Sequence, residues 1–246
     1  MSYQIPPDAV RIWRGFRQST LPQEEFFQRL GETFIPSTVQ MQIKNGLDTY
    51  VPTIPCGMAQ KPATVPDETA ILFWNSQQTY WDGFKTLAGR TYTLTHGGCY
   101  TPESGADFPI LFDGDLVLDQ CYYLIDKSQD WMKGKIRHLV GGLPAGANTA
   151  ELFQNLQSIL VETQVRGKIQ GGIICVGADY ITYWELGDGT DPGLDQLQSH
   201  CDWSHVFEPV PTTLPPQAAL WDDWPGMKVK PGDTYNMKFT RAFENE

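Results

Sequence analysis

The stretch IRHLVGGLPAGANTAELFQNLQSILVETQVR (residues 136–166) aligns without a gap on VRIWRGFRQSTLPQEEFFQRLGETFIPSTVQ (residues 10–40). The alignment superposes seven identical residues: Arg11/Arg137, Gly15/Gly141, Glu25/Glu151, Phe27/Phe153, Gln28/Gln154, Leu30/Leu156 and Val39/Val165. Two amphipathic helices can resemble each other by chance, but here a strand-like segment and a loop precede the helix at the same distance. A repeat of this length indicates two similar units, each with one face to bury.

The second copy has the clearer pattern. Its first segment (135–142) has the β-branched and apolar content of a strand. Apolar residues then recur at three- and four-residue spacing over 150–165, which predicts an amphipathic helix. Two apolar runs in 171–186 are joined by Gly-Ala-Asp, as in a hairpin, and a short helix (191–203) and a last strand (205–210) follow. The predicted order is β-α-β-β-α-β.

The first copy follows the same order with longer loops. Its four strands are expected, in order, at residues 10–16, at 38–43 or 48–54, at 69–76 and at 116–125. One helix is expected from Pro22 to about residue 35. A second is expected over 77–88, capped by Ser76, with inward-facing Tyr80, Trp81, Phe84 and Leu87.

This order is that of the ferredoxin-like unit, whose four-stranded sheet carries helices on one face and leaves the other open. The predicted fold class is therefore α+β, with a first unit at 1–126 and a second at 127–210. A Pro- and Trp-rich C-terminal arm (211–246) lies outside the repeat. Two such units can pack their open faces together, so we expect a single-chain α+β barrel with a lined cavity.

Composition limits the function classes. The chain has 246 residues and 41% hydrophobic content, enough for two domains of ordinary size or one large domain, with a real core. A formal net charge of −11 with no Lys/Arg cluster argues against nucleic acid as a partner. No apolar run is long enough for a membrane span, and the N-terminus shows no secretory signal, so we expect a cytoplasmic protein. It is expected to be a monomer or homodimer that meets no membrane.

The repeated order, together with the W-N-S-x-x-x-Y-W segment at 74–81, resembles the dimeric α+β barrel superfamily. This group includes the antibiotic-biosynthesis monooxygenases, the EthD-like proteins and the IsdG-type haem oxygenases. The resemblance covers about 200 residues and implies a tandem fusion of two halves. In its cofactor-independent oxygenases, Trp and Asn residues assist substrate deprotonation and reaction with oxygen. That role carries over to Trp74 and Asn75, which match the pattern.

Two histidines are candidate catalytic bases. His138 replaces Ile12 of the first copy, and strand alternation places both on the same face. If that face is inward, His138 is a general base in the cavity and Ile12 lines it; a histidine satisfied by its neighbours is the alternative. His96 lies in the apparent loop THGGCY, where Gly97 and Gly98 would let a ligand approach the backbone. An ordinary exposed turn is the alternative there.

Aromatic residues supply the expected substrate contacts. Trp74 and Trp184 are matched as strand ends through ILFW and ITYW, and they are followed by Asn75 and Glu185. Together with Tyr183 they could hold a flat molecule and orient a carbonyl or phenol. The alternative is that these aromatics pack on one another and fill the core.

No cofactor or metal is expected. The five cysteines have no zinc-site spacing, and His200 and His205 with Asp202 do not share one helix face. The helix at 77–88 contains no histidine to bind haem iron, and nucleotide-binding motifs and triad motifs are absent from the sequence. The sequence thus predicts binding of a small apolar or aromatic molecule, with a cofactor-independent monooxygenase or an isomerase or cyclase as the catalytic possibility. A non-catalytic ligand-binding or structural protein is the alternative.

Overall fold

The computed structural model describes residues 9–43, 45–125, 131, 134–165, 167–189, 193–209, 211–214 and 227–239. The chain divides into two compact units. Unit 1 comprises 1–57, 67–106 and 210–246, and unit 2 comprises 58–66 and 107–209. None of the helices described is long and apolar enough to cross a membrane.

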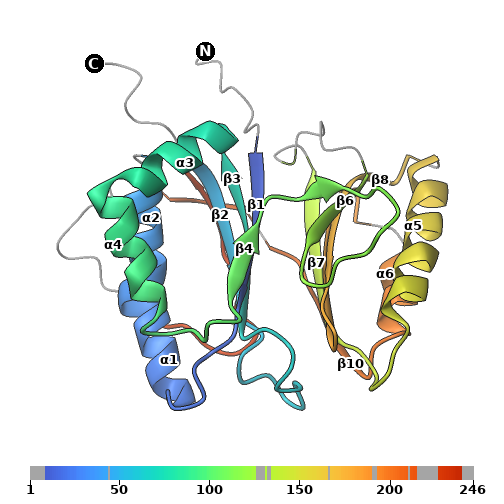
Figure 1. The fold of residues 1–246 in the computed structure, drawn as a ribbon, viewed down its shortest axis with the longest axis horizontal. Coiled ribbons are helices and arrows are strands. Elements are labelled where there is room, and N and C mark those ends of the chain that lie inside the picture. The colour runs from blue at the N-terminus through green and yellow to red at the C-terminus, as the bar shows by residue number, and fades with distance from the viewer. Residues whose placement is uncertain are drawn as a thin grey trace. The chain divides into compact units, whose positions relative to one another are not determined.

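Unit 1 contains one sheet and a set of helices that cover one of its faces (Figure 1). Along the chain its elements are β1 (Ala9–Gly15), α1 (Gln23–Arg29), the π-helical segment η1 (Leu30–Phe34), α2 (Ile35–Ile43), β2 (Leu47–Thr53), β3 (Glu68–Trp74), α3 (Gln77–Lys85), α4 (Leu87–His96), β4 (Gly105–Asp107), β11 (Pro211–Leu214) and β12 (Asn236–Phe239). Ser76 caps α3 as the sequence predicts, since its hydroxyl accepts the Thr79 N–H at 3.1 Å.

Unit 2 also consists of one sheet with helices on one face. Its elements are β5 (Ile110–Leu111), β6 (Cys121–Ile125), β7 (Lys135–Gly142), α5 (Thr149–Val165), β8 (Ile169–Val176), β9 (Tyr180–Gly187), α6 (Gly193–Gln198) and β10 (Trp203–Phe207). Helices α5 and α6 cover one face of the sheet (Figure 1). The core beneath them includes Tyr122, Leu139, Phe153 and Tyr183.

The strand order confirms the predicted fold class. The sheet of unit 1 runs β11-β12-β2-β3-β1-β4, and that of unit 2 runs β10-β7-β9-β8-β6-β5. In each sheet the four strands of the β-α-β-β-α-β order occur as fourth, first, third, second, which is the ferredoxin-like arrangement. Each sheet then carries two further strands beyond its second strand. The face-to-face packing of the two sheets into a barrel stays a prediction.

Several predicted elements need correction. The predicted fourth strand of the first copy (116–125) contains β6, which pairs with β8 in unit 2; the fourth strand of unit 1 is the short β4. The compact units accordingly divide the chain near residue 106 rather than 126. Of the predicted C-terminal arm, β11 and β12 join the sheet of unit 1, and residues 215–226 lie outside the described residues.

The predicted helix at 77–88 is also different. It is two helices, α3 and α4, which meet at Thr86. Tyr80 faces inward as expected, but Trp81, Phe84 and Leu87 are exposed at 42%, 39% and 76%. The second strand is β2, the later of the two predicted alternatives, and the earlier segment belongs to α2.

Candidate functional site

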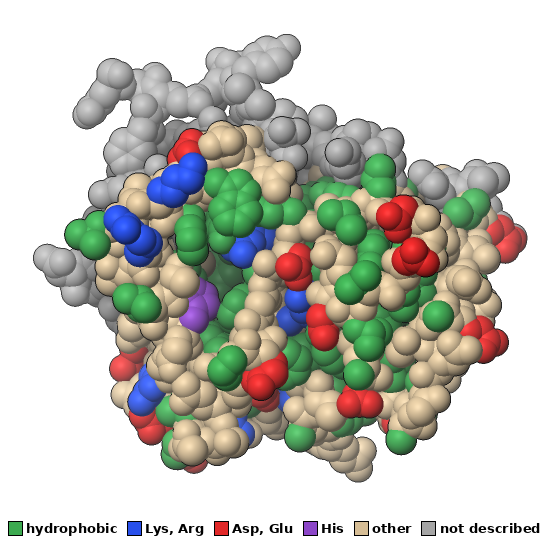
Figure 2. All heavy atoms as spheres, in the orientation of Figure 1, with side chains coloured by type: hydrophobic (Ala, Val, Ile, Leu, Met, Phe, Trp, Pro, Cys, Tyr) green, Lys and Arg blue, Asp and Glu red, His purple; other side chains and the backbone are tan. Residues whose placement is uncertain are grey.

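A cavity of about 590 Å³ lies within unit 1, between the sheet and the helices that cover it. Figure 2 shows the surface hollowed here, between the α3–α4 region and β4, with hydrophobic side chains around the opening. Its volume is in the range of small-molecule sites. Its lining includes the aromatic residues Trp13, Phe34, Tyr50, Trp74, Tyr80, Phe84, Tyr92 and Tyr100.

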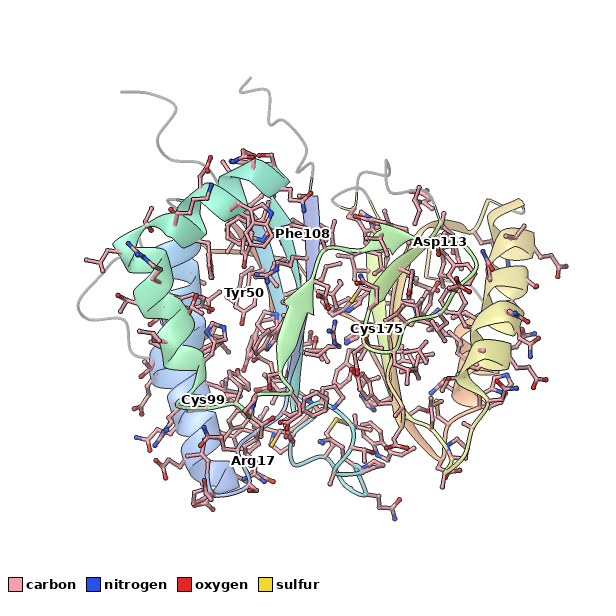
Figure 3. All side chains as sticks on the ribbon, in the orientation of Figure 1. Arg17, Tyr50, Cys99, Phe108, Asp113 and Cys175 are labelled. Carbon is pink, nitrogen blue, oxygen red and sulfur yellow. The ribbon has the colours of Figure 1, made fainter. Side chains whose placement is uncertain are left out.

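Strand alternation explains which residues reach this cavity. Arg11 pairs with Leu72, and Trp74 pairs with Ala9, so these side chains lie on the helix-covered face. Tyr50 of β2 pairs with Leu72 and shares that face (Figure 3). Ile12 pairs with Ile71 on the opposite face and does not line this cavity; its place in a cavity between the two sheets stays a prediction.

The aromatic rings meet edge to face. His96 packs against Trp13 with ring centroids 5.1 Å apart, against Phe34 at 4.8 Å and against Tyr92 at 4.9 Å. Such contacts fix each ring in one orientation and leave ring faces and edges toward the cavity. The lining is therefore suited to a flat, largely apolar molecule.

Arg11 brings a positive charge to the cavity. Its guanidinium carbon lies 4.1 Å from the centre of the Tyr80 ring, and Nη2 donates to the Ala106 carbonyl at 3.0 Å. It also donates to the Tyr80 hydroxyl. Burial raises the pKa of Tyr80, and the charge of Arg11 opposes that rise. An oxyanion on a bound molecule would be stabilised by the same charge.

Arg137 of unit 2, which the sequence alignment matches with Arg11, has a different environment. Arg137 pairs across the strands with Glu185, and their side chains form an ion pair at 3.3 Å. Arg137 Nε also lies 3.5 Å from a carboxylate oxygen of Glu208. In unit 1 the cross-strand neighbour of Arg11 is Leu72 instead of a carboxylate. The two units thus differ in charge at matching positions.

A buried carboxylate lies behind the aromatic lining. Glu68, at the start of β3, has no exposed surface. Its Oε1 accepts the Tyr50 hydroxyl at 3.1 Å, and its Oε2 accepts the Trp13 indole N–H at 3.1 Å and the Tyr100 hydroxyl. Burial raises the pKa of Glu68 to about 7, although these three donors act to lower it. Glu68 can therefore gain or lose a proton near neutral pH.

Gly15 makes this arrangement possible. It pairs with Glu68 across β1 and β3. A Cβ at this position would lie 2.6 Å from a ring carbon of Tyr100 and 2.8 Å from Nε1 of Trp13. Only a residue without a side chain lets the Tyr100 ring approach the strand closely enough to reach Glu68.

Two predicted site residues line the cavity. Trp74 is 1% exposed and packs edge to face on Tyr80 at 5.1 Å, and its indole N–H has no hydrogen-bond partner among the described residues. His96 is the last residue of α4, not part of a loop, and its Nδ1 donates to the Tyr92 carbonyl at 3.2 Å. Burial lowers the pKa of His96. Asn75, by contrast, follows β3 outside the cavity lining, where its backbone N–H donates to the Gly46 carbonyl at 2.9 Å.

The other predicted residues lie in unit 2. His138 is fully buried and stacks on Trp184 with a centroid distance of 3.5 Å. Its Nδ1–H donates to the Tyr183 carbonyl at 3.0 Å, and burial lowers its pKa to about 3. It is therefore neutral and weakly basic, as expected of a core histidine. Tyr183 belongs to the core under α5 and α6, and Glu185 forms the ion pair with Arg137.

The predicted match of Trp74 with Trp184 is wrong. Ile12 pairs with Ile71, whereas His138 pairs with Trp184. With Ile12 superposed on His138, the counterpart of Trp184 is therefore Ile71. Trp74 lies three residues farther along β3, an odd number, so it points to the opposite face of its sheet. The two tryptophans do not form a matched pair.

The sequence reading missed Glu68, Tyr50 and Tyr100 and assigned no role to Arg11. One signal was present: of the two arginines in β1, alternation places Arg11 on the same face as Glu68, the charged residue of β3. Arg11 directly precedes Ile12 in β1, so it lies on the opposite face of the sheet.

Comparisons with known proteins show distant likenesses only. No protein-family model matches the chain, and no curated protein matches its sequence. A candidate monooxygenase from Lactobacillus acidophilus is 7% identical, with a TM-score of 0.40 over 83% of this chain and 93% of its own. An anthrone oxidase-like protein is 8% identical, with a TM-score of 0.40 over 83% and 95%. Chlorite dismutase from Candidatus Nitrospira defluvii is 11% identical, with a TM-score of 0.32 over 82% and 90%. Values this low carry no functional conclusion, and the functional evidence lies in the cavity itself.

Proposed function

We propose that unit 1 binds a small, largely apolar or aromatic molecule in its cavity and transforms it without a cofactor, as a monooxygenase or an isomerase does. The observation that carries the proposal is the buried Trp74. Its side chain lines a cavity of about 590 Å³, and its buried indole N–H lacks a hydrogen-bond partner among the described residues. A buried donor without an acceptor is costly, so we infer that the ring turns its N–H toward an oxygen of a bound molecule.

The rest of the lining supports the same ligand class. Ring faces and edges offer stacking surface, and Arg11 offers a charge for a carbonyl or phenol oxygen. The cavity thus combines an apolar body with a few polar groups at fixed places, as small-molecule sites do.

Trp74→Phe tests the binding proposal. The variant keeps an aromatic ring but removes the N–H, so affinity for naphthols and flat polycyclic phenols should fall about tenfold, the equivalent of one lost hydrogen bond. Trp81→Phe is the matched control, because Trp81 is 42% exposed and outside the lining. Calorimetric titration measures both. Equal affinity in the wild type and Trp74→Phe would remove the main support for the proposal.

A binding protein without catalysis is the second candidate function, because the cavity and its orphaned donor account for binding by themselves. Oxygen consumption and product analysis with the tightest ligand separate the two. Binding without any chemical change in the ligand would assign the protein to this second class.

A further inference from the structure

The cavity wall contains a hydrogen-bonded pair that could accept a proton from a ligand. Tyr100 lines the cavity, and its hydroxyl donates to Oε2 of the fully buried Glu68 behind it. A tyrosine oxygen that donates its own hydrogen still has lone pairs with which to accept another. The pair therefore links the cavity to a carboxylate that solvent does not reach directly.

Tyr50 also lines the cavity, and its hydroxyl donates to the other carboxylate oxygen of Glu68, Oε1, at 3.1 Å. Tyr100 differs because its ring packs edge to face against Trp13, whose indole N–H donates to the same oxygen of Glu68, Oε2. These contacts hold the Tyr100 hydroxyl against the carboxylate in one orientation, so Tyr100 is the connection between a ligand and Glu68.

We propose that Tyr100 and Glu68 form a proton relay, and that the ligand of the cavity is an aromatic molecule with an acidic phenol or enol hydroxyl. In the transfer, the ligand O–H bond breaks and its proton moves to the Tyr100 oxygen. The Tyr100 proton moves at the same time to Glu68. The products are a neutral Glu68, an unchanged neutral Tyr100 and a ligand oxyanion, whose charge faces Arg11. This inference rests on the proposed binding function.

The neighbouring titratable groups leave Glu68 as the proton acceptor. The tyrosines and the cysteine that face it are Tyr50 from β2, Tyr92 from α4, and Cys99 and Tyr100 from the segment after α4. Burial raises the pKa of these four, and that of Cys99 reaches about 11, so they stay protonated at neutral pH. His96 of α4 packs against Tyr100 with ring centroids 6.2 Å apart, and burial lowers its pKa, so it is a weaker base than an exposed histidine. Glu68, with a pKa of about 7, exchanges its proton in the physiological range. Arg11 on β1 is the positive charge on the same face.

Proton uptake on binding tests the relay. The probe is a nitronaphthol, with its methyl ether as a ligand of similar shape that has no acidic hydroxyl. At about pH 8.5 both Glu68 and the free nitronaphthol are ionised. Because two anions close together repel each other, the complex should take up about one proton from the buffer per bound molecule. Calorimetry in two buffers of different ionisation enthalpy measures this uptake. The methyl ether should bind without it.

The variants identify the path. Glu68→Gln removes the carboxylate and should abolish the uptake. Tyr100→Phe removes the hydroxyl that donates to the ligand oxyanion after the transfer, so it should weaken nitronaphthol about tenfold and the methyl ether little. Tyr180→Phe is the matched control, because Tyr180 is a buried tyrosine of unit 2 whose hydroxyl bonds Asp119. Tyr100→Phe keeps the test decisive if Glu68→Gln folds poorly.

The outcomes separate the two proposals. If both probes bind but Glu68→Gln takes up as many protons as the wild type, or Tyr100→Phe weakens both probes equally, the relay is refuted and the binding site stands. If neither probe binds, the proposed function fails, and the relay fails with it.

Discussion

Replacing Glu68 by glutamine should change how the stability of the protein depends on pH. Burial raises the pKa of Glu68 from 4.5 to about 7 in the folded chain. Between these values the folded state holds a proton that the unfolded state has released, so stability falls as pH rises. This pKa shift corresponds to about 3 kcal/mol of stabilisation of the folded protein, which is fully present below about pH 4.5 and lost above about pH 7. Glu68→Gln has no such proton and should lack this loss.

The measurement is urea unfolding of both proteins at several pH values from acid to mildly alkaline. The quantity that matters is the difference between wild type and variant, because other groups titrate equally in both. The wild type should lose about 3 kcal/mol relative to Glu68→Gln across the range. Glu32→Gln, an exposed glutamate of the same unit, is the control. A difference that stays constant with pH would refute the reasoning about the buried carboxyl.

Two further predictions concern packing and burial. Burial lowers the pKa of His138 from 6.5 to about 3. The neutral ring therefore stabilises the folded protein above pH 6.5, and this stabilisation is lost on acidification. Relative to His138→Leu, the wild type should lose about 2 kcal/mol of unfolding free energy between about pH 6.5 and pH 5. Urea unfolding measures this loss, and His200→Gln, at an exposed histidine, is the control. Gly15→Ala places a Cβ 2.6 Å from the Tyr100 ring, which must move. Its melting temperature should drop by the equivalent of about 1–3 kcal/mol. Gly105→Ala is the control, because nothing lies near a Cβ at that position and its melting temperature should change little. Equal melting temperatures in the two variants would contradict the close packing at Gly15.

Much of the fold follows from local patterns. The strand at 135–142, the helix after it and the hairpin that follows are visible because alternation and helical periodicity act over a few residues. The short β4 was missed because Gly105–Asp107 has no apolar alternation, and its pairing comes from its place beside β1. The apolar 121–125 gave a stronger strand signal, but nothing local says which sheet a strand joins.

The site was less predictable because it depends on register. Trp74 and His96 were named as candidates and do line the cavity, but Trp184 was matched to the wrong residue by a sequence likeness that ignores pairing. One-residue differences in register change which face a side chain occupies. Glu68 and Tyr100 are far apart in sequence, and their contact depends on the space left by Gly15. No pattern in a single sequence gives that three-residue arrangement.

The order in which the strands of unit 1 are synthesised determines when its sheet can be completed. β2, which carries Tyr50 of the cavity, pairs on one side with β3 and on the other with β12, where Tyr50 lies opposite Met237. Residues 107–209, most of unit 2, lie between β3 and β12 in the chain, so they emerge from the ribosome before β12. Until β12 arrives, β2 is an open sheet edge able to pair with another chain. A protein shortened by its last dozen residues would keep that edge, so expression of C-terminal truncations should favour aggregates over a folded first unit.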